Sequence, residues 1–331
     1  HQLVDSMAML LLSQPSRYDV VVTENWLDNL LACIESDPAI GMVSPCCNST
    51  SNFQQIPTRY TNMEQMQKFA SDYNRSNPDL WEERVRLMQF LAVYRPEAYA
   101  CAGGYDNYFS FGMFADDDFC LRIRRSGYKL IFCKDTFVHH YGSATIKESQ
   151  FEVMNQSRSR FVLKYGFDLW PHTEGNPEWL KLHDFAKPGS TRLLLLNPSL
   201  GAEALQIKKV VEEAGGELAL KAVTPEACFE PDLRLLTEDV TITEDCAGVL
   251  SGLPENGFDG VLICRNAGDL MQLDEVLVQA YRVLKPGGVL LMKLPNRFYF
   301  RTLIRLAERS PVNPYFSPED LDRFAVLNVE A

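Results

Sequence analysis

Residues Phe114–Arg122 read Phe-Ala-Asp-Asp-Asp-Phe-Cys-Leu-Arg and put three carboxylates directly before a helical pattern. A later segment, Val138–Ser143, carries two adjacent histidines, His139 and His140. Adjacent carboxylates repel one another, so they need helix-terminal amides, a cation or a substrate proton to stabilise them. The two segments therefore predict one site in which acids and an imidazole act together.

Two simpler interpretations of these residues remain open. One acid is expected to be the N-cap of the helix that ends at Ser126-Gly127, but capping needs only one side-chain oxygen. A histidine in a buried strand can be satisfied by a backbone carbonyl. Because neighbouring strand residues face opposite sides, at most one of His139 and His140 can point toward the acids. The other is then part of the scaffold.

Three segments, Gly103–Asp106, Phe114–Arg125 and His139–Ser143, together resemble the second half of a family 2 glycosyltransferase of the GT-A fold. The resemblance implies that Asp116 is the catalytic base and Asp118 the last acid of the family's acidic motif. Ala115 stands where the family has glutamate. The residues that the resemblance places on the acceptor side are Gly103, Gly104, Asp106, Asp117 and Trp81.

The same resemblance implies a metal site. Asp19 matches the second aspartate of the family's Asp-x-Asp motif, although Arg17 stands where the first would be. His139 is the preferred histidine ligand and His140 the reserve. Carboxylate oxygens suit Mg²⁺ or Mn²⁺, which would bridge the donor diphosphate.

The function implied is that of a metal-dependent glycosyltransferase of the hexosyl-transfer class, active in polysaccharide biosynthesis. It would move a sugar from a nucleotide-sugar donor to a glycan or glycoconjugate acceptor, with Asp116 as general base. The alternative is an S-adenosylmethionine-dependent methyltransferase, or a non-catalytic methyltransferase-like binding module.

Composition limits the partners and the compartment. A formal net charge of -12 argues against nucleic acid as a partner, because its phosphates attract basic surfaces. Nine cysteines with no Cys-x-x-Cys pair fit reduced thiols in the cytoplasm. A peripheral place at the inner face of the membrane is the second option for location. The apolar run Met7–Leu12 is too short for a transmembrane segment.

Strand and helix patterns alternate along the chain, which predicts an α/β fold in two domains. The first, 1–186, is expected to be a partial GT-A glycosyltransferase domain that lacks its nucleotide-binding part. Residues 187–190 read as a linker. The second, 191–331, opens with a buried strand at Arg192–Leu196 and is expected to be Rossmann-like. Both ends of the chain look cut.

The second domain resembles the later half of class I S-adenosylmethionine-dependent methyltransferases, through Phe258–Ile263 and Leu284–Gly288. The resemblance implies that Asn197, Gly201 and Asp259 face the cofactor. In its first strand-to-helix turn only Gly201 remains of the family's glycines. Pro198 and Glu203 are then expected to crowd the ligand, so S-adenosylmethionine should bind weakly or not at all.

Overall fold

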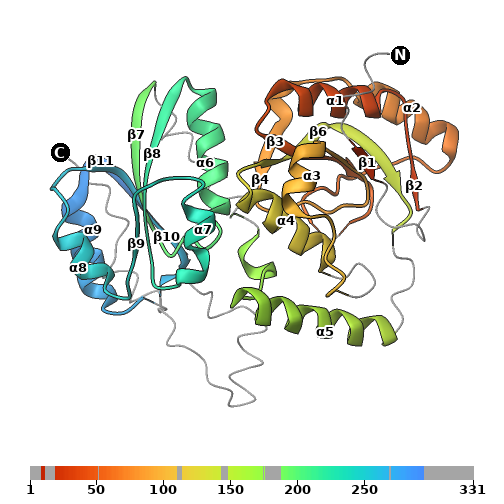
Figure 1. Cartoon of the computed structure of the whole chain (residues 1–331). Helices are drawn as coiled ribbons and strands as arrows, with labels where there is room; N and C mark the ends of the chain where they lie inside the picture. Colours follow the sequence, from red (N-terminus) through yellow and green to blue (C-terminus); the bar gives the residue numbers. More distant parts are fainter. Residues whose placement is uncertain are drawn as a thin grey trace, which may run out of the picture. The chain divides into compact units, whose positions relative to one another are not determined.

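The computed structural model divides the chain into two compact units, His1–Glu174 and Gly175–Ala331, called unit 1 and unit 2 below (Figure 1). It describes residues 9–11, 19–50, 52–109, 114–142, 148–173, 175, 188–267 and 270–293. The sequence segments at 12–18, at 143–147 and after 293 lie outside the described residues, and so does Lys187 of the expected linker.

Unit 1 is a mixed sheet with helices on both faces. Its strands are β1 (Met9–Leu11), β2 (Val20–Val21), β3 (Ile40–Cys47), β4 (Trp81–Arg84), β5 (Ala92–Tyr94) and β6 (Lys129–His140). Its helices are α1 (Trp26–Ser36), α2 (Met63–Tyr73), α3 (Pro96–Ala102), α4 (Ala115–Arg125) and α5 (Glu148–Tyr165), with short 3₁₀ turns at Pro78–Leu80 and Trp170–His172.

The strand order in unit 1 is β1-β5-β3-β6-β2, and β4 also pairs with β6. Among the described strand pairs of unit 1, only β3 and β6 run parallel, whereas the other pairs are antiparallel. Side chains along β3 alternate between two cores because the strand period is two. Met42 and Cys46 pack with α2, α3 and α4 on one face, and Val43 and Cys47 pack with α1 on the other.

Unit 2 is a parallel five-stranded sheet. Its strands are β7 (Gly189–Leu196), β8 (Gly216–Thr224), β9 (Val240–Ile242), β10 (Phe258–Asn266) and β11 (Leu284–Lys293). Its helices are α6 (Ala202–Glu213), α7 (Glu230–Leu233), α8 (Cys246–Ser251) and α9 (Leu273–Val283), with a 3₁₀ turn at Ala227–Phe229.

The strand order in unit 2 is β11-β10-β7-β8-β9, with every described pair parallel. The chain starts in the centre at β7, builds outward through β8 and β9, and then returns to the other side of β7 with β10. Leu194 and Leu196 face α8 and α9, whereas Leu193 and Leu195 face α6. The apolar run predicted as a buried strand is therefore buried on both faces, as parallel sheets require.

The expected linker is shorter in the structure. β7 begins at Gly189, so the last two residues of the expected linker belong to a strand.

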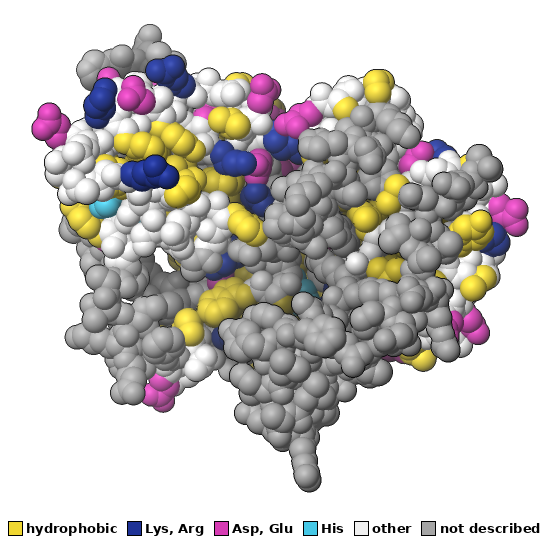
Figure 2. All heavy atoms as spheres, turned by 180° about the vertical axis from the view of Figure 1, so that it is seen from behind, with side chains coloured by type: hydrophobic (Ala, Val, Ile, Leu, Met, Phe, Trp, Pro, Cys, Tyr) yellow, Lys and Arg dark blue, Asp and Glu magenta, His cyan; other side chains and the backbone are white. Residues whose placement is uncertain are grey.

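The surface carries both signs of charge. Acidic and basic side chains are interspersed over the face in Figure 2. Among the described residues, no helix has both the length and the apolar character needed to cross a membrane.

Candidate functional site

The acidic stretch of unit 1 forms the first turn of α4. The helix starts at Ala115, and its N-cap is Phe114, whose backbone is left-handed (φ 64°) and whose side chain makes no capping hydrogen bond. The expectation that one of the three aspartates is the N-cap is therefore wrong. All three lie inside the helix, where the amide dipoles of the first turn favour negative charge.

Two of the three acids are engaged by distant side chains. Asp117 accepts hydrogen bonds from Arg86 Nε and, at 3.1 Å, from Trp170 Nε1. Asp118 is fully buried. Its Oδ1 accepts from Lys164 Nζ and the Tyr165 hydroxyl, each at 2.6 Å, and its Oδ2 accepts from Arg122 Nε at 2.7 Å. Both acids thus tie other segments to α4, and their oxygens point into these contacts.

Asp116 is different. Nearby backbone amides of the helix start favour its charged form, and no side-chain hydrogen bond to it is found among the described residues. Burial raises the pKa of Asp116 to about 7, and the negative charge of Asp117 adds to the effect, while Arg86 opposes it. Asp116 can therefore exchange a proton near neutral pH.

The two histidines have separate partners, as the strand period predicts. The Nδ1 atom of His139 lies 2.5 Å from the Tyr60 hydroxyl. Burial lowers the pKa of His139, with a contribution from His140. His140 donates from Nδ1 to the Ser49 carbonyl at 2.6 Å, and its Nε2 lies 3.4 Å from Asp19 Oδ2. The structure brings Asp19 and His140 together, but it shows neither histidine in contact with Asp116 or Asp118.

A divalent metal site is not formed by these residues. Among the described parts of the chain, no group of three or more histidine, cysteine, aspartate or glutamate side chains is arranged to hold a metal ion. The Asp19 and His140 pair supplies only two ligands. The expectation of bound Mg²⁺ or Mn²⁺ is therefore corrected.

The residues expected on an acceptor side have structural partners. Gly103 and Gly104, with φ of 76° and 71°, end α3, where left-handed backbone suits glycine. Asp106 accepts from Lys164 Nζ at 2.7 Å. Trp81 donates from Nε1 to Asp135 Oδ2 at 2.8 Å. These contacts explain each residue without a ligand.

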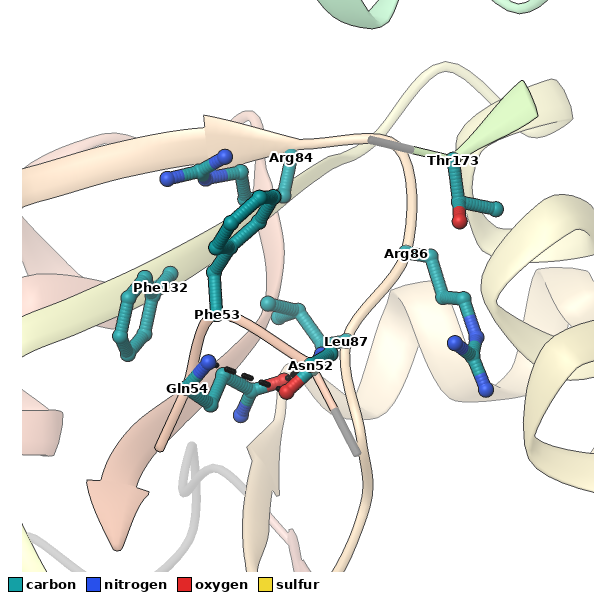
Figure 3. Close-up of a pocket in the computed structure, with 8 residues that line it drawn as sticks. All are labelled: Asn52, Phe53, Gln54, Arg84, Arg86, Leu87, Phe132 and Thr173. Carbon is teal, nitrogen blue, oxygen red and sulfur yellow. Dashed lines mark hydrogen bonds between the residues drawn. The ribbon is translucent and has the colours of Figure 1, made fainter. Parts of the chain in front are cut away.

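A small pocket of about 20 Å³ lies beside β4 and is lined by residues around Gln54 and by Thr173 (Figure 3). Figure 3 shows Arg84 beside Phe53 and Arg86 pointing away from it. Both arginines are already paired, Arg84 with Glu82 and Arg86 with Asp117. This cavity seats little more than a water molecule and offers no free charge to a ligand.

The carboxyl edge of unit 2 has the geometry of a ligand site. In open parallel sheets, ligands bind at the carboxyl ends of the strands where the strand order reverses, and here that point lies between β7 and β10. The turn from β7 to α6 holds three alternate residues in left-handed backbone, Asn197 (φ 52°), Ser199 (φ 52°) and Gly201 (φ 80°). Only one of them is glycine.

Left-handed backbone at residues other than glycine costs about 1–3 kcal/mol each and clusters at functional sites. Asparagine tolerates it best, because its short polar side chain bonds locally. At Asn197 and Ser199 the turn therefore keeps a conformation that glycine would adopt without strain. At Gly201 an added Cβ would meet the end of the Leu236 side chain, and the positive φ is the reason that this position favours glycine.

Asn197 has an unsatisfied polar atom. Its side chain is 5% exposed, and its Oδ1 has no hydrogen-bond partner in the described part of the chain, while its backbone amide donates to the Val223 carbonyl at 2.8 Å. A buried acceptor without a donor costs about 1–3 kcal/mol. Asn197 thus presents an acceptor at the end of β7 that a ligand donor would satisfy.

Glu226 lies at the end of β8, on the same edge. Its Oε1 accepts from Arg265 Nη1 at 2.5 Å, and its Oε2 accepts from Thr224 Oγ1 at 3.1 Å. Asp259, by contrast, lies at the amino end of β10, where its Oδ2 accepts from the Arg192 amide and from Lys285 Nζ, each at 2.8 Å. The structure brings Asn197 and Gly201 to the carboxyl edge and leaves Asp259 at the opposite one.

Sequence reasoning missed Arg265. It follows the buried apolar stretch Val261–Cys264 of β10, and a cation directly after such a stretch is the signal that could have found it. Its pairing with Glu226 could not be predicted, because the two residues are brought together only by the strand order.

Comparisons with known proteins give matches only among solved structures. No protein-family model matches the chain, and a search of curated proteins finds no match. Solved structures do match. An arsenic(III) S-adenosylmethionine methyltransferase of Chlamydomonas reinhardtii is 24% identical with a TM-score of 0.31, over 41% of this chain and 50% of that one. This chain thus spans half the length of that enzyme.

Two other matches are of the same kind. A S-adenosylmethionine-dependent methyltransferase of Thermotoga maritima is 21% identical with a TM-score of 0.34, over 52% of this chain and 76% of that one. Phosphoethanolamine N-methyltransferase 2 of Haemonchus contortus, in complex with S-adenosylmethionine, is 19% identical with a TM-score of 0.35, over 57% of this chain and 45% of that one. Likeness at these levels does not extend to substrates.

These findings correct the first resemblance. The three structures named above are methyltransferases and none of them is a glycosyltransferase, so the family 2 assignment, the hexosyl-transfer class and the nucleotide-sugar and glycan partners are wrong. A GT-A domain is not shown. Unit 2 has an α/β, Rossmann-like fold. The expectation of a metal ion with S-adenosylmethionine excluded does not agree with these structures, of which the Haemonchus contortus enzyme holds S-adenosylmethionine.

Proposed function

We propose that unit 2 binds S-adenosylmethionine at the carboxyl edge of its sheet and acts as a methyltransferase-type domain. The observation that carries the proposal is the β7–α6 turn, where Asn197, Ser199 and Gly201 adopt left-handed backbone at the point where the strand order reverses. Strain of this kind persists where surrounding structure maintains a functional conformation. The turn is what lets backbone approach a nucleoside cofactor in such sheets.

The chemistry of the edge fits this cofactor. The unpaired Oδ1 of Asn197 calls for a donor, and the cofactor carries amino and hydroxyl groups. Glu226 follows β8, where an acid in related folds accepts hydrogen bonds from the ribose hydroxyls. When bound, S-adenosylmethionine would supply a methyl group on a positively charged sulfur. Asn197 and Glu226 would hold and orient it.

The side-chain setting of the cysteines fits a reducing compartment such as the cytoplasm. All nine cysteines are free thiols, and most of them are buried. Burial raises the pKa of Cys46 and of Cys120 to about 12, which keeps these thiols protonated and unreactive.

Titration calorimetry with S-adenosylhomocysteine tests the proposal on the full chain. This product form binds without turnover, so the heat reports binding alone. We expect saturable binding with one site per chain. Absence of binding at millimolar ligand, by a protein that circular dichroism shows to be folded, would contradict the proposal.

The Asn197→Gly variant tests the role of the Asn197 side chain, because it removes the amide group and keeps the left-handed backbone of the turn. Glycine adopts positive φ without strain, so the free energy of unfolding should stay the same or rise by about 1 kcal/mol. Affinity for S-adenosylhomocysteine should fall by roughly 5- to 10-fold, because one hydrogen bond is lost. The matched control is Asp239→Asn, which removes an exposed ion pair with Lys221 beside β9 and should leave the affinity unchanged. Tighter binding by Asn197→Gly would show that the amide oxygen plays no part.

A further inference from the structure

We infer that Arg265 is a positioning residue, which holds the Glu226 carboxylate in the orientation that the cofactor's ribose requires. The inference rests on the proposed function. Arg265 comes from β10 and Glu226 follows β8, and β7 lies between these two strands in the sheet. Strands are spaced by about 4.8 Å, so the ion pair crosses the end of β7, over the turn that starts at Asn197.

The Glu226 carboxylate is fixed from two sides. Arg265 Nη1 donates to Oε1 at 2.5 Å and Thr224 Oγ1 donates to Oε2 at 3.1 Å, so both oxygens are anchored and the plane of the carboxylate is set. Thr224 is fully buried at the end of β8, which makes it a rigid anchor. Glutamate has several rotatable bonds, and fixing them before a ligand arrives lowers the entropy cost of binding.

The Glu226 carboxylate can still accept hydrogen bonds from a ligand after these two bonds are made. A carboxylate has about four acceptor positions, and Arg265 and Thr224 use two of them. The side chains of Arg265 and Glu226 are 35% and 34% exposed, so the pair is accessible. The remaining lone pairs can accept from the two hydroxyls of a ribose. A ligand with a free vicinal diol therefore fits this carboxylate while the ion pair stays intact.

A purely structural bridge between strands is the competing explanation. Partly exposed ion pairs contribute little to stability, typically 0–1 kcal/mol. Measurements of stability alone would therefore not distinguish a structural bridge from a pair in which Arg265 positions Glu226 for a ligand. Coupling between Arg265 and Glu226 in ligand binding does distinguish the two, because a structural bridge would leave the affinity unchanged.

The test is a double-mutant cycle in which calorimetry measures affinity for S-adenosylhomocysteine. Arg265→Gln and Glu226→Gln should each weaken binding by about 10-fold, since each disturbs one charge-assisted contact. The double variant should bind like Glu226→Gln alone, because Arg265 acts only through Glu226. Arg265→Lys keeps one charged donor and should restore most of the affinity.

A control variant and the wild type distinguish failure of this inference from failure of the proposed function. Lys221→Gln removes the cation of a similar pair with Asp239 (2.5 Å) in the same sheet and should bind as the wild type does. Unchanged affinity in Arg265→Gln, or additive losses in the double variant, would overturn the inference while the wild type still binds. If the wild type does not bind, the proposed function itself fails.

Discussion

Three adjacent aspartates in α4 have three different environments, and Asp116 is the one that titrates near neutrality. Burial raises its pKa to about 7, and Asp117 adds its negative charge. In the unfolded chain the pKa of an aspartate is near 3.8. The folded state therefore binds more protons between these values, and stability falls as pH rises through the window.

Asp116→Asn removes this dependence. Relative to the wild type, the variant should gain stability from pH 5 to pH 7, by at most about 1.4 kcal/mol per pH unit, and then level off above pH 8. Urea unfolding at a series of pH values measures the difference. Asp72→Asn, at an exposed pair with Lys68, is the control and should give a constant difference. A flat difference for Asp116→Asn would mean that its pKa is ordinary.

At the scale of elements, Asp118 fastens α5 to α4. Lys164 and Tyr165 belong to the end of α5, and both donate to the buried Oδ1 of Asp118 at 2.6 Å. Lys164 also bonds to Asp106, but that carboxylate is 35% exposed. The same ammonium thus has one buried and one solvated partner, which makes the two aspartates a matched pair.

Asp118→Asn should lower the free energy of unfolding by about 2–4 kcal/mol, because it leaves charged donors at a buried site without their counter-charge. Asp106→Asn should cost less than about 1 kcal/mol, as for other solvated pairs. Chemical denaturation monitored by tryptophan fluorescence compares them. Equal losses would show that burial does not decide the strength of these contacts.

The strand β7 and the helix α4 show which parts of the structure could be predicted from the sequence and which could not. The buried strand at Arg192–Leu196 and the alternation of strands and helices were predictable, because apolar patterning reports burial directly. The role of Asp117 and Asp118 was not, because Arg86 and Lys164 reach them from 31 and 46 residues away. A run of acids looks the same in sequence whether it serves catalysis or packing.

The backbone of the β7–α6 turn was also predicted wrongly from the sequence, but for a different reason. The loss of its glycines predicted loss of the cofactor, on the assumption that backbone follows residue type. Asn197 and Ser199 nevertheless take left-handed backbone, because the turn between a central strand and its helix is fixed by tertiary packing. The packing of Leu236 against Gly201 is part of that constraint.

For the whole molecule, we assign a ligand site to unit 2 and structural roles to the acids of unit 1. Hydrogen–deuterium exchange of the full chain, with and without millimolar S-adenosylhomocysteine, tests this most directly. Bound ligand should slow exchange at amides 197–203 and 224–227, which line the carboxyl edge, and leave the first turn of α4 unchanged. Protection confined to unit 1, or no change anywhere, would contradict a ligand site in unit 2.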